Sequence, residues 1–296
     1  MLQGQQAYEE SPHIPFRQLY TNRGNFVQAS PLWTLHGDHK ITLAAIQDIR
    51  TRLSSTKSIL IAGGGPAGVE TAGEIASLYR NKEITILSGS TRLLPRLQND
   101  KPGKRAQRQL ESLSVKTVHN VRVTSSKATK DNKLSVALSD GTTRTVDIFI
   151  DATGGVPNTS FLPAAWLDDS KSVATDVATL RTTKAPAGVY AIGDVASYSN
   201  RNIPDTYWAV PPLGYSIWSD LRAAAKEHTV GIAGLKEKKY KQLEKDMQVV
   251  PVGPKGGVGV IFGWSVPSFL VWLLKSRTFF LEKAAGLAEG AEVTKP

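Results

Sequence analysis

The chain of 296 residues contains no cysteine. This absence excludes disulfide bonds, cysteine-ligated zinc, iron–sulfur centres and thiol catalysis by the chain itself. Residues 1–16 show no cationic start followed by an apolar core, so we expect no secretory signal. No motif that reads DNA or RNA is visible, and we expect neither a nucleic-acid partner nor a metal site.

The composition is that of a globular protein with an excess of basic residues. Hydrophobic residues make up 41% of the chain, so extensive disorder is not expected. The length suggests two domains rather than one. The net charge of +10 and the isoelectric point near 9.6 favour an anionic partner, such as a nucleotide phosphate or an acidic membrane surface.

The most informative stretch of the chain spans residues 57–88. An apolar run at 59–62 leads into Gly63-Gly64-Gly65-Pro66-Ala67-Gly68, and a helical pattern and a second apolar run at 84–87 follow. A G-x-G-x-x-G motif is informative when a strand precedes it and a helix follows it, as here. Residues 63–68 are therefore predicted to bind a dinucleotide; the alternative is a glycine-rich loop that binds nothing.

Each glycine of the motif has its own expected role. Gly63 permits the tight turn, Gly65 lets a pyrophosphate approach the backbone, and Gly68 lets the helix pack against the strand. The phosphates would then lie against the free N–H groups at the start of the helix.

The residues after the second strand bear on the choice of nucleotide. An acidic residue here would bond the ribose of NAD, but the sequence has Ser88-Gly89-Ser90-Thr91-Arg92. Serines and an arginine can accept a 2′-phosphate, so Ser88 and Arg92 favour NADPH, or both nucleotides. The alternative is that Arg92 is only a solvated cation in a loop.

Further elements are expected on both sides of this unit. A helix is predicted from Asp38, with apolar positions four residues apart. A short helix at 104–113 and strands at 115–118, 121–124, 134–138 and 143–150 are predicted to follow, the last three forming a β-meander. The final strand runs into a glycine turn at 151–155, which contains Thr153 and Gly154.

The second half of the chain offers fewer signals. Strands are predicted at 172–181 and 189–194, the second ending in Gly193-Asp194. A carboxylate at the end of a buried strand can bond a sugar or polyol hydroxyl; alternatively Asp194 caps the next segment. A helix is predicted to start at Pro211-Pro212.

The C-terminal part is basic and aromatic. Residues 236–247 are predicted to form a solvated helix, and 267–280 a short amphipathic helix after a strand. Aromatic residues beside Lys275 and Arg277 suit a membrane interface, and also a domain or dimer contact. The uncharged run 258–274 is barely long enough to span a bilayer, which leaves a spanning helix as the alternative.

Three motifs stand in a fixed order: GGGPAGVETAGE at 63–74, DATGGVPN at 151–158 and VYAIGDVA at 189–196. Together they resemble the pyridine-nucleotide flavin reductases, in the branch of apoptosis-inducing-factor-like (AIF-like) proteins and type II NADH dehydrogenases. The sequence at 256–280 is similar to the C-terminus of the ferroptosis-suppressor type of AIF-like quinone reductase. The absence of cysteine agrees with this branch rather than with the disulfide reductases.

The resemblance implies an α/β, Rossmann-type flavoprotein fold with two dinucleotide-binding domains and a β-meander crossover. Residues 63–68 would hold NAD(P)H, and Glu70 would lie near the nicotinamide and flavin as the catalytic residue. Thr153 and Gly154 are expected among the cofactor-binding residues, and Gly193 and Asp194 on the ribityl side of FAD. Hydride would pass from NAD(P)H to FAD, and two electrons then to a quinone or other small acceptor.

The sequence departs from this family at its start, where the FAD fingerprint expected before residue 57 is missing. We therefore expect an incomplete FAD domain, with residues 1–56 as its remnant and 156–228 as its returning half, and weak FAD binding. Residues 57–155 would form the NAD(P)H domain and 229–296 a C-terminal region.

Two other functions stay open: a non-catalytic NAD(P)-binding homologue, or a membrane-surface interaction module. A cytoplasmic location is expected, with peripheral attachment to a mitochondrial or lipid-droplet surface as the membrane-bound alternative.

Overall fold

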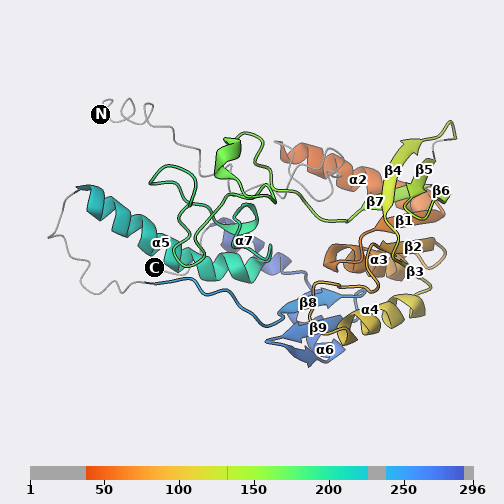
Figure 1. Cartoon of the computed structure of the whole chain (residues 1–296). Coiled ribbons are helices and arrows are strands. Elements are labelled where there is room, and N and C mark those ends of the chain that lie inside the picture. The colour runs from red at the N-terminus through yellow and green to blue at the C-terminus, as the bar shows by residue number, and fades with distance from the viewer. Residues whose placement is uncertain (1–37, 132, 226–237, 290–296) are drawn as a thin grey trace.

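The computed structural model describes residues 38–131, 133–225 and 238–289 (Figure 1). Its centre is a four-stranded parallel sheet in the order β3-β2-β1-β7. The mixed α/β architecture with a parallel sheet confirms the expected Rossmann-type fold class.

Three of the four strands are connected by two strand–helix–strand crossovers. They comprise β1 (Ser58–Ala62), α3 (Pro66–Leu78), β2 (Glu83–Ser88), α4 (Lys101–Ser112) and β3 (Lys116–His119). The predicted helix from Asp38 is α2 (His39–Ser55), where the Asp38 side chain accepts a hydrogen bond from the Lys40 N–H and so caps the helix.

The crossover back to the centre of the sheet is a β-meander, as predicted. It consists of β4 (Val123–Ala128), β5 (Leu134–Leu138) and β6 (Thr143–Val146), and it leads into β7 (Ile148–Asp151), which pairs in parallel with β1. The single strand predicted at 143–150 is wrong, because the chain changes sheets at Asp147.

Alternate residues of the parallel strands pack against different layers, because successive side chains of a strand point to opposite faces. One face contributes Ile59, Ile61, Ile84, Ile86, Ile148 and Ile150 to a core shared with α3 and α4. The other face contributes Leu60 and Leu87, which pack against the meander residues Val136, Leu138 and Val146. The continuous apolar runs in the sequence reflect this burial on both faces.

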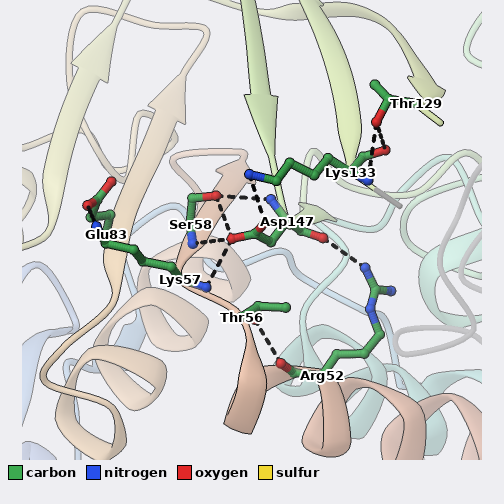
Figure 2. A network of polar contacts seen from close by, with 8 residues as sticks. All are labelled: Arg52, Thr56, Lys57, Ser58, Glu83, Thr129, Lys133 and Asp147. Carbon is green, nitrogen blue, oxygen red and sulfur yellow. Dashed lines mark hydrogen bonds and ion pairs between the residues drawn. The ribbon is translucent and has the colours of Figure 1, made fainter. Parts of the chain in front are cut away.

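Asp147 holds the amino ends of β1 and β7 together, as Figure 2 shows. Its Oδ2 accepts hydrogen bonds from the Lys57 N–H, the Ser58 N–H and the Ser58 hydroxyl, at 2.7–2.9 Å. Arg52 of α2 donates to the Asp147 carbonyl at 2.9 Å. The hydrogen bonds from Ser58 and Lys57 stabilise the ionised carboxylate and lower the pKa of Asp147 to about 2.

A second core lies around α5 (Ile203–Ala225), the long helix at the left of Figure 1, away from the parallel sheet. The strands predicted at 172–181 and 189–194 are wrong: the two segments are joined by isolated bridges, and Gly193–Val195 is a 3-10 turn, η3. A second 3-10 turn, η2, spans Ala164–Trp166. A strand needs a continuous ladder of bridges, and in the described residues the β-bridges of these segments are isolated ones.

The predicted start of the helix at Pro211-Pro212 is also wrong, because α5 begins eight residues earlier. The Asn202 side chain accepts from the Asp205 N–H at 2.9 Å, and the buried Asp205 carboxylate accepts from the Asn200 N–H at 2.7 Å. This capping arrangement starts the helix, and the two prolines lie inside it.

The C-terminal part contains a three-stranded antiparallel sheet of β8 (Gln248–Pro251), β9 (Gly257–Ile261) and β10 (Trp264–Val266). Val250, Val252, Val258 and Val260 join the core around α3 and α4. Short helical segments follow: α6 (Ser268–Val271), a π-helical turn η4 (Trp272–Ser276), η5 (Leu281–Lys283) and α7 (Ala284–Ala288). The amphipathic helix predicted at 267–280 is therefore only partly formed: α6 passes into the π-helical turn η4, and residues 277–280 are turns.

Two other expectations for this region can be compared with the structure. In the described part of the chain, no helix is long and apolar enough to cross a membrane. The helix predicted at 236–247 is wrong over 238–247, and its first two residues lie outside the described ranges. Tyr240 is buried in this segment and donates to Asp205 at 3.0 Å, which ties the segment to α5 in an irregular conformation.

Candidate functional site

The glycine-rich loop follows β1 at the carboxyl edge of the parallel sheet. Gly63 has φ +118°, and a Cβ there would lie 2.2 Å from the Ala152 carbonyl oxygen at the end of β7. A Cβ on Gly68 would lie 1.9 Å from the Gly63 carbonyl oxygen. Both positions therefore require glycine, one for the turn and one for the close packing of α3 against the loop.

Gly65 differs from its neighbours because the space beside it is open. It is the N-cap of α3, and a Cβ there would have no atom within 4 Å. Pro66 is the first residue of the helix, so the next N–H groups, those of Ala67 and Gly68, have no partner within the helix. Open space beside free N–H groups at a helix start is the arrangement that binds a phosphate.

The loop after β2 lies beside the glycine loop. A Cβ on Gly64 would be 2.6 Å from Ser88 Oγ, and the Leu94 N–H donates to the Gly64 carbonyl at 2.7 Å. The buried Ser88 hydroxyl donates to the Arg92 carbonyl at 2.8 Å. The Arg92 guanidinium donates to the carbonyls of Pro95 and Leu97.

These contacts bear on the expected role of Ser88 and Arg92 in reading the nucleotide. Both polar groups are engaged in hydrogen bonds that shape the loop itself. Their assignment to the 2′ position stays a prediction, but a phosphate would compete with those bonds.

The turn after β7 closes the other side of the glycine loop. The Asp151 carboxylate accepts from the Thr153 N–H at 3.0 Å and from the Thr153 hydroxyl at 2.6 Å. Gly154 follows with φ +102°, and Thr153 and Gly154 are exposed. The structure thus brings Gly63, Gly64, Ser88 and Thr153 together at one edge of the sheet.

Glu70 lies on α3, just past its first turn, and forms an ion pair with Lys275. The Lys275 Nζ is 2.6 Å from Glu70 Oε1 and 3.4 Å from the Val249 carbonyl. The side chains are largely shielded, with 18% exposure for Glu70 and 22% for Lys275. The sequence predicted a membrane interface or a domain or dimer contact for Lys275, and its contact with Glu70 is of the second kind, within the chain.

Glu74 lies one helical turn beyond Glu70. Burial raises the pKa of the Glu74 carboxyl, and the negative charge of Glu70 raises it further. Its Oε1 is buried and has no hydrogen-bond partner among the described residues. Glu70, Glu74 and Lys275 are therefore half-buried polar residues at the edge of the core around α3.

Gly193 and Asp194 lie in η3, which packs against α5 in the second core. The Gly193 N–H donates to the Tyr198 hydroxyl at 3.1 Å, and Asp194 is half-buried. Arg201 donates to the Gly155 carbonyl at 3.1 Å, which links this region to the turn after β7.

These residues fit the two expected cofactors to different extents. A nicotinamide dinucleotide fits the loop at 63–68, since Gly65 leaves the space that its pyrophosphate needs. For FAD, Gly193 and Asp194 are present, but residues 38–131, 133–225 and 238–289 contain no second glycine fingerprint between a strand and a helix. The described residues thus lack the pyrophosphate site that FAD requires.

Several known proteins are similar to this chain. Oxidoreductase phnG of Penicillium herquei is 34% identical over 288 residues, which are 90% of this chain and 68% of that protein. Ferroptosis suppressor protein 1 of Xenopus tropicalis is 26% identical over 244 residues, 80% of this chain and 62% of that protein. The chain thus spans about two thirds of the length of these relatives.

A ferredoxin reductase from Rhodopseudomonas palustris has a related structure, with a TM-score of 0.46 and 22% identity over 59% of this chain and 42% of that one. Residues 28–211 match the family model described as pyridine nucleotide-disulphide oxidoreductase. The chain therefore belongs to the pyridine nucleotide-disulphide oxidoreductase family, whose members depend on FAD and NAD(P)H.

Proposed function

We propose that the chain is the NAD(P)H-binding part of an AIF-like, ferroptosis-suppressor-type oxidoreductase that transfers electrons from NAD(P)H through FAD to a quinone-type acceptor. The observation that carries the proposal is the glycine loop, with a required turn at Gly63, open space at Gly65 and close packing at Gly68. The quinone acceptor rests on the resemblance of residues 63–74 and 256–280 to that branch.

Each part of the site has a proposed task. NAD(P)H supplies a hydride when bound, and the N–H groups of Ala67 and Gly68 hold its pyrophosphate. By the resemblance, Glu70 would lie near the reacting ring, and the Lys275 ammonium would orient its carboxylate through their 2.6 Å contact. Quinone reduction takes up protons, and this pair can hold and deliver one of them.

Gly65→Ala tests the nucleotide site directly. The backbone at Gly65 has φ −79°, and the new methyl group would meet no protein atom within 4 Å. We expect a folded protein with a modest loss of stability, roughly 1 kcal/mol at the helix cap. Affinity for NADH and NADPH should fall by about tenfold or more, because the methyl occupies the space of the pyrophosphate.

The measurement is a calorimetric titration of folded wild type and Gly65→Ala with both nucleotides. Unchanged affinity in the variant, or no binding to the wild type, would overturn the proposed site. Visible flavin absorbance and NAD(P)H:quinone activity of residues 1–296 test the redox part. A nucleotide-binding protein with little flavin and no turnover would favour the non-catalytic alternative, whereas stoichiometric flavin with steady turnover would support the enzyme.

The C-terminal surface motivates a proposal about location. Trp264, Phe269 and Leu281 are 79%, 68% and 75% exposed, and the exposed Arg277 lies in the same region. Aromatic side chains beside cations favour a membrane interface. We propose a cytoplasmic protein that contacts an anionic membrane surface through residues 262–283, where a quinone would be available.

A further inference from the structure

Arg122 lies against the carboxyl end of β2. It follows β3 and precedes the first meander strand, and its Nη2 donates to the Gly89 carbonyl at 3.1 Å. A Cβ on Gly89 would lie 2.8 Å from Arg122 Cζ and 2.9 Å from its Nη1. The guanidinium therefore occupies the place that any other side chain at position 89 would take.

The backbone around Arg122 is fastened to this loop on several sides. The Asn120 N–H donates to the Ser90 carbonyl at 3.1 Å, and the Val121 N–H donates to the Ser88 carbonyl at 3.2 Å. The Arg122 N–H donates to Ser139 Oγ at 3.0 Å. Arg122 is thus held beside residues 88–90 by backbone hydrogen bonds, while its side chain is exposed.

The carboxyl end of the second strand is where the adenine ribose of a dinucleotide lies in this fold. At this point the chain has Ser88 rather than the acid that bonds a ribose hydroxyl. A guanidinium has five donor hydrogens, and the contact with Gly89 uses one Nη2 hydrogen. Its remaining donors suit a phosphate, which arginine can bind through two parallel hydrogen bonds.

We propose that Arg122 binds the 2′-phosphate of NADPH and makes the site prefer NADPH to NADH. The inference rests on the proposed nucleotide site and specifies its ligand. In this proposal Arg122, and not Arg92, recognises the 2′-phosphate, because the Arg92 guanidinium already donates to the carbonyls of Pro95 and Leu97. Gly89 contributes to the proposed phosphate site, because its lack of a side chain leaves room for the Arg122 guanidinium.

Adenosine 2′,5′-bisphosphate and AMP are the probes, since they differ only in the 2′-phosphate. For Arg122→Gln, the affinity for the bisphosphate should fall by about tenfold or more, the loss of one charge-assisted contact. Affinity for AMP should stay within about twofold. Lys127→Gln removes a charge from an exposed position on β4 and is the matched control, with both affinities unchanged.

Two further variants separate the effect of where the Arg122 guanidinium lies from the effect of removing a positive charge near the loop. Gly89→Ala retains Arg122 but displaces its guanidinium, so it should also weaken the bisphosphate selectively. Arg92→Gln should lower the melting temperature and leave the preference for the bisphosphate intact.

The inference is overturned if Arg122→Gln weakens both probes equally, if Arg92→Gln abolishes the preference, or if the wild type binds NADH as tightly as NADPH. These outcomes would refute the role of Arg122 but would not contradict the proposed nucleotide site. Failure of the wild type to bind any of these nucleotides would instead remove the proposed function, and this inference with it.

Discussion

Lys275 Nζ lies 2.6 Å from Glu70 Oε1, although the two residues are 205 positions apart in the chain. The contact joins the C-terminal π-helical turn to the helix that follows the glycine loop. The Lys275 ammonium also lies 5.9 Å from the centre of the Phe279 ring. The C-terminal region is therefore part of the candidate site as well as of the domain core.

The Glu70–Lys275 pair should contribute measurably to stability. Both side chains are mostly shielded, so we expect a coupling of about 1–2 kcal/mol, above the usual value for an exposed pair. Urea unfolding of Glu70→Gln, Lys275→Gln and the double variant measures it. Arg277→Gln, at a nearby exposed cation, is the control and should change little. Additive single effects would contradict an energetically coupled pair.

Gly68→Ala should damage the fold rather than only the ligand site. The added methyl would lie 1.9 Å from the Gly63 carbonyl oxygen, so α3 must move away from the loop. Overpacking of this kind costs roughly 1–3 kcal/mol. Thermal unfolding should show a larger loss for Gly68→Ala than for Gly65→Ala. Equal melting temperatures for the two variants would mean that the loop and helix are not closely packed.

Asp147 should make the stability of the chain depend on acid pH. The pKa of Asp147 falls from 3.8 to about 2 on folding, so its carboxylate stabilises the native state above pH 3.8. This contribution, about 2 kcal/mol, is lost as the pH falls through about 2. Asp147→Asn should therefore be less stable than the wild type at pH 7, by roughly 1–2 kcal/mol.

The difference between Asp147→Asn and the wild type should shrink as the pH approaches 2. Denaturant unfolding at several pH values checks this, with Asp169→Asn, in an exposed turn, as the control. A difference that stays constant with pH would show that the carboxylate charge does not contribute.

The proposed membrane contact predicts salt-sensitive binding to anionic vesicles. Trp264→Ser and Phe269→Ser remove exposed aromatic side chains, so flotation with anionic vesicles should fall while the melting temperature changes little. Binding should also weaken as salt screens the basic residues. Leu78→Ser, an exposed apolar position on α3, is the control. Binding that survives both substitutions and high salt would count against this surface.

The local sequence was sufficient to predict the parallel sheet and the glycine loop. The roles of Gly63, Gly65 and Gly68 depend on backbone angles and spacings within one strand–helix unit, so the motif predicts them without knowledge of the rest of the chain. The β-meander was predictable for the same reason, since alternating apolar residues and turn signals are local. The break at Asp147 was not, because it depends on hydrogen bonds to Lys57 and Ser58.

The sequence alone determined the fold class, the glycine loop between β1 and α3, the absence of thiol chemistry and the basic charge of the chain. Tertiary structure decided which distant side chains meet at the site. The pairing of Lys275 with Glu70, and the placement of Arg122 rather than Arg92 over the end of β2, follow from the packing of segments far apart in the chain. No periodicity or fixed spacing in the sequence marks such contacts, because the packing of whole layers of secondary structure sets their geometry.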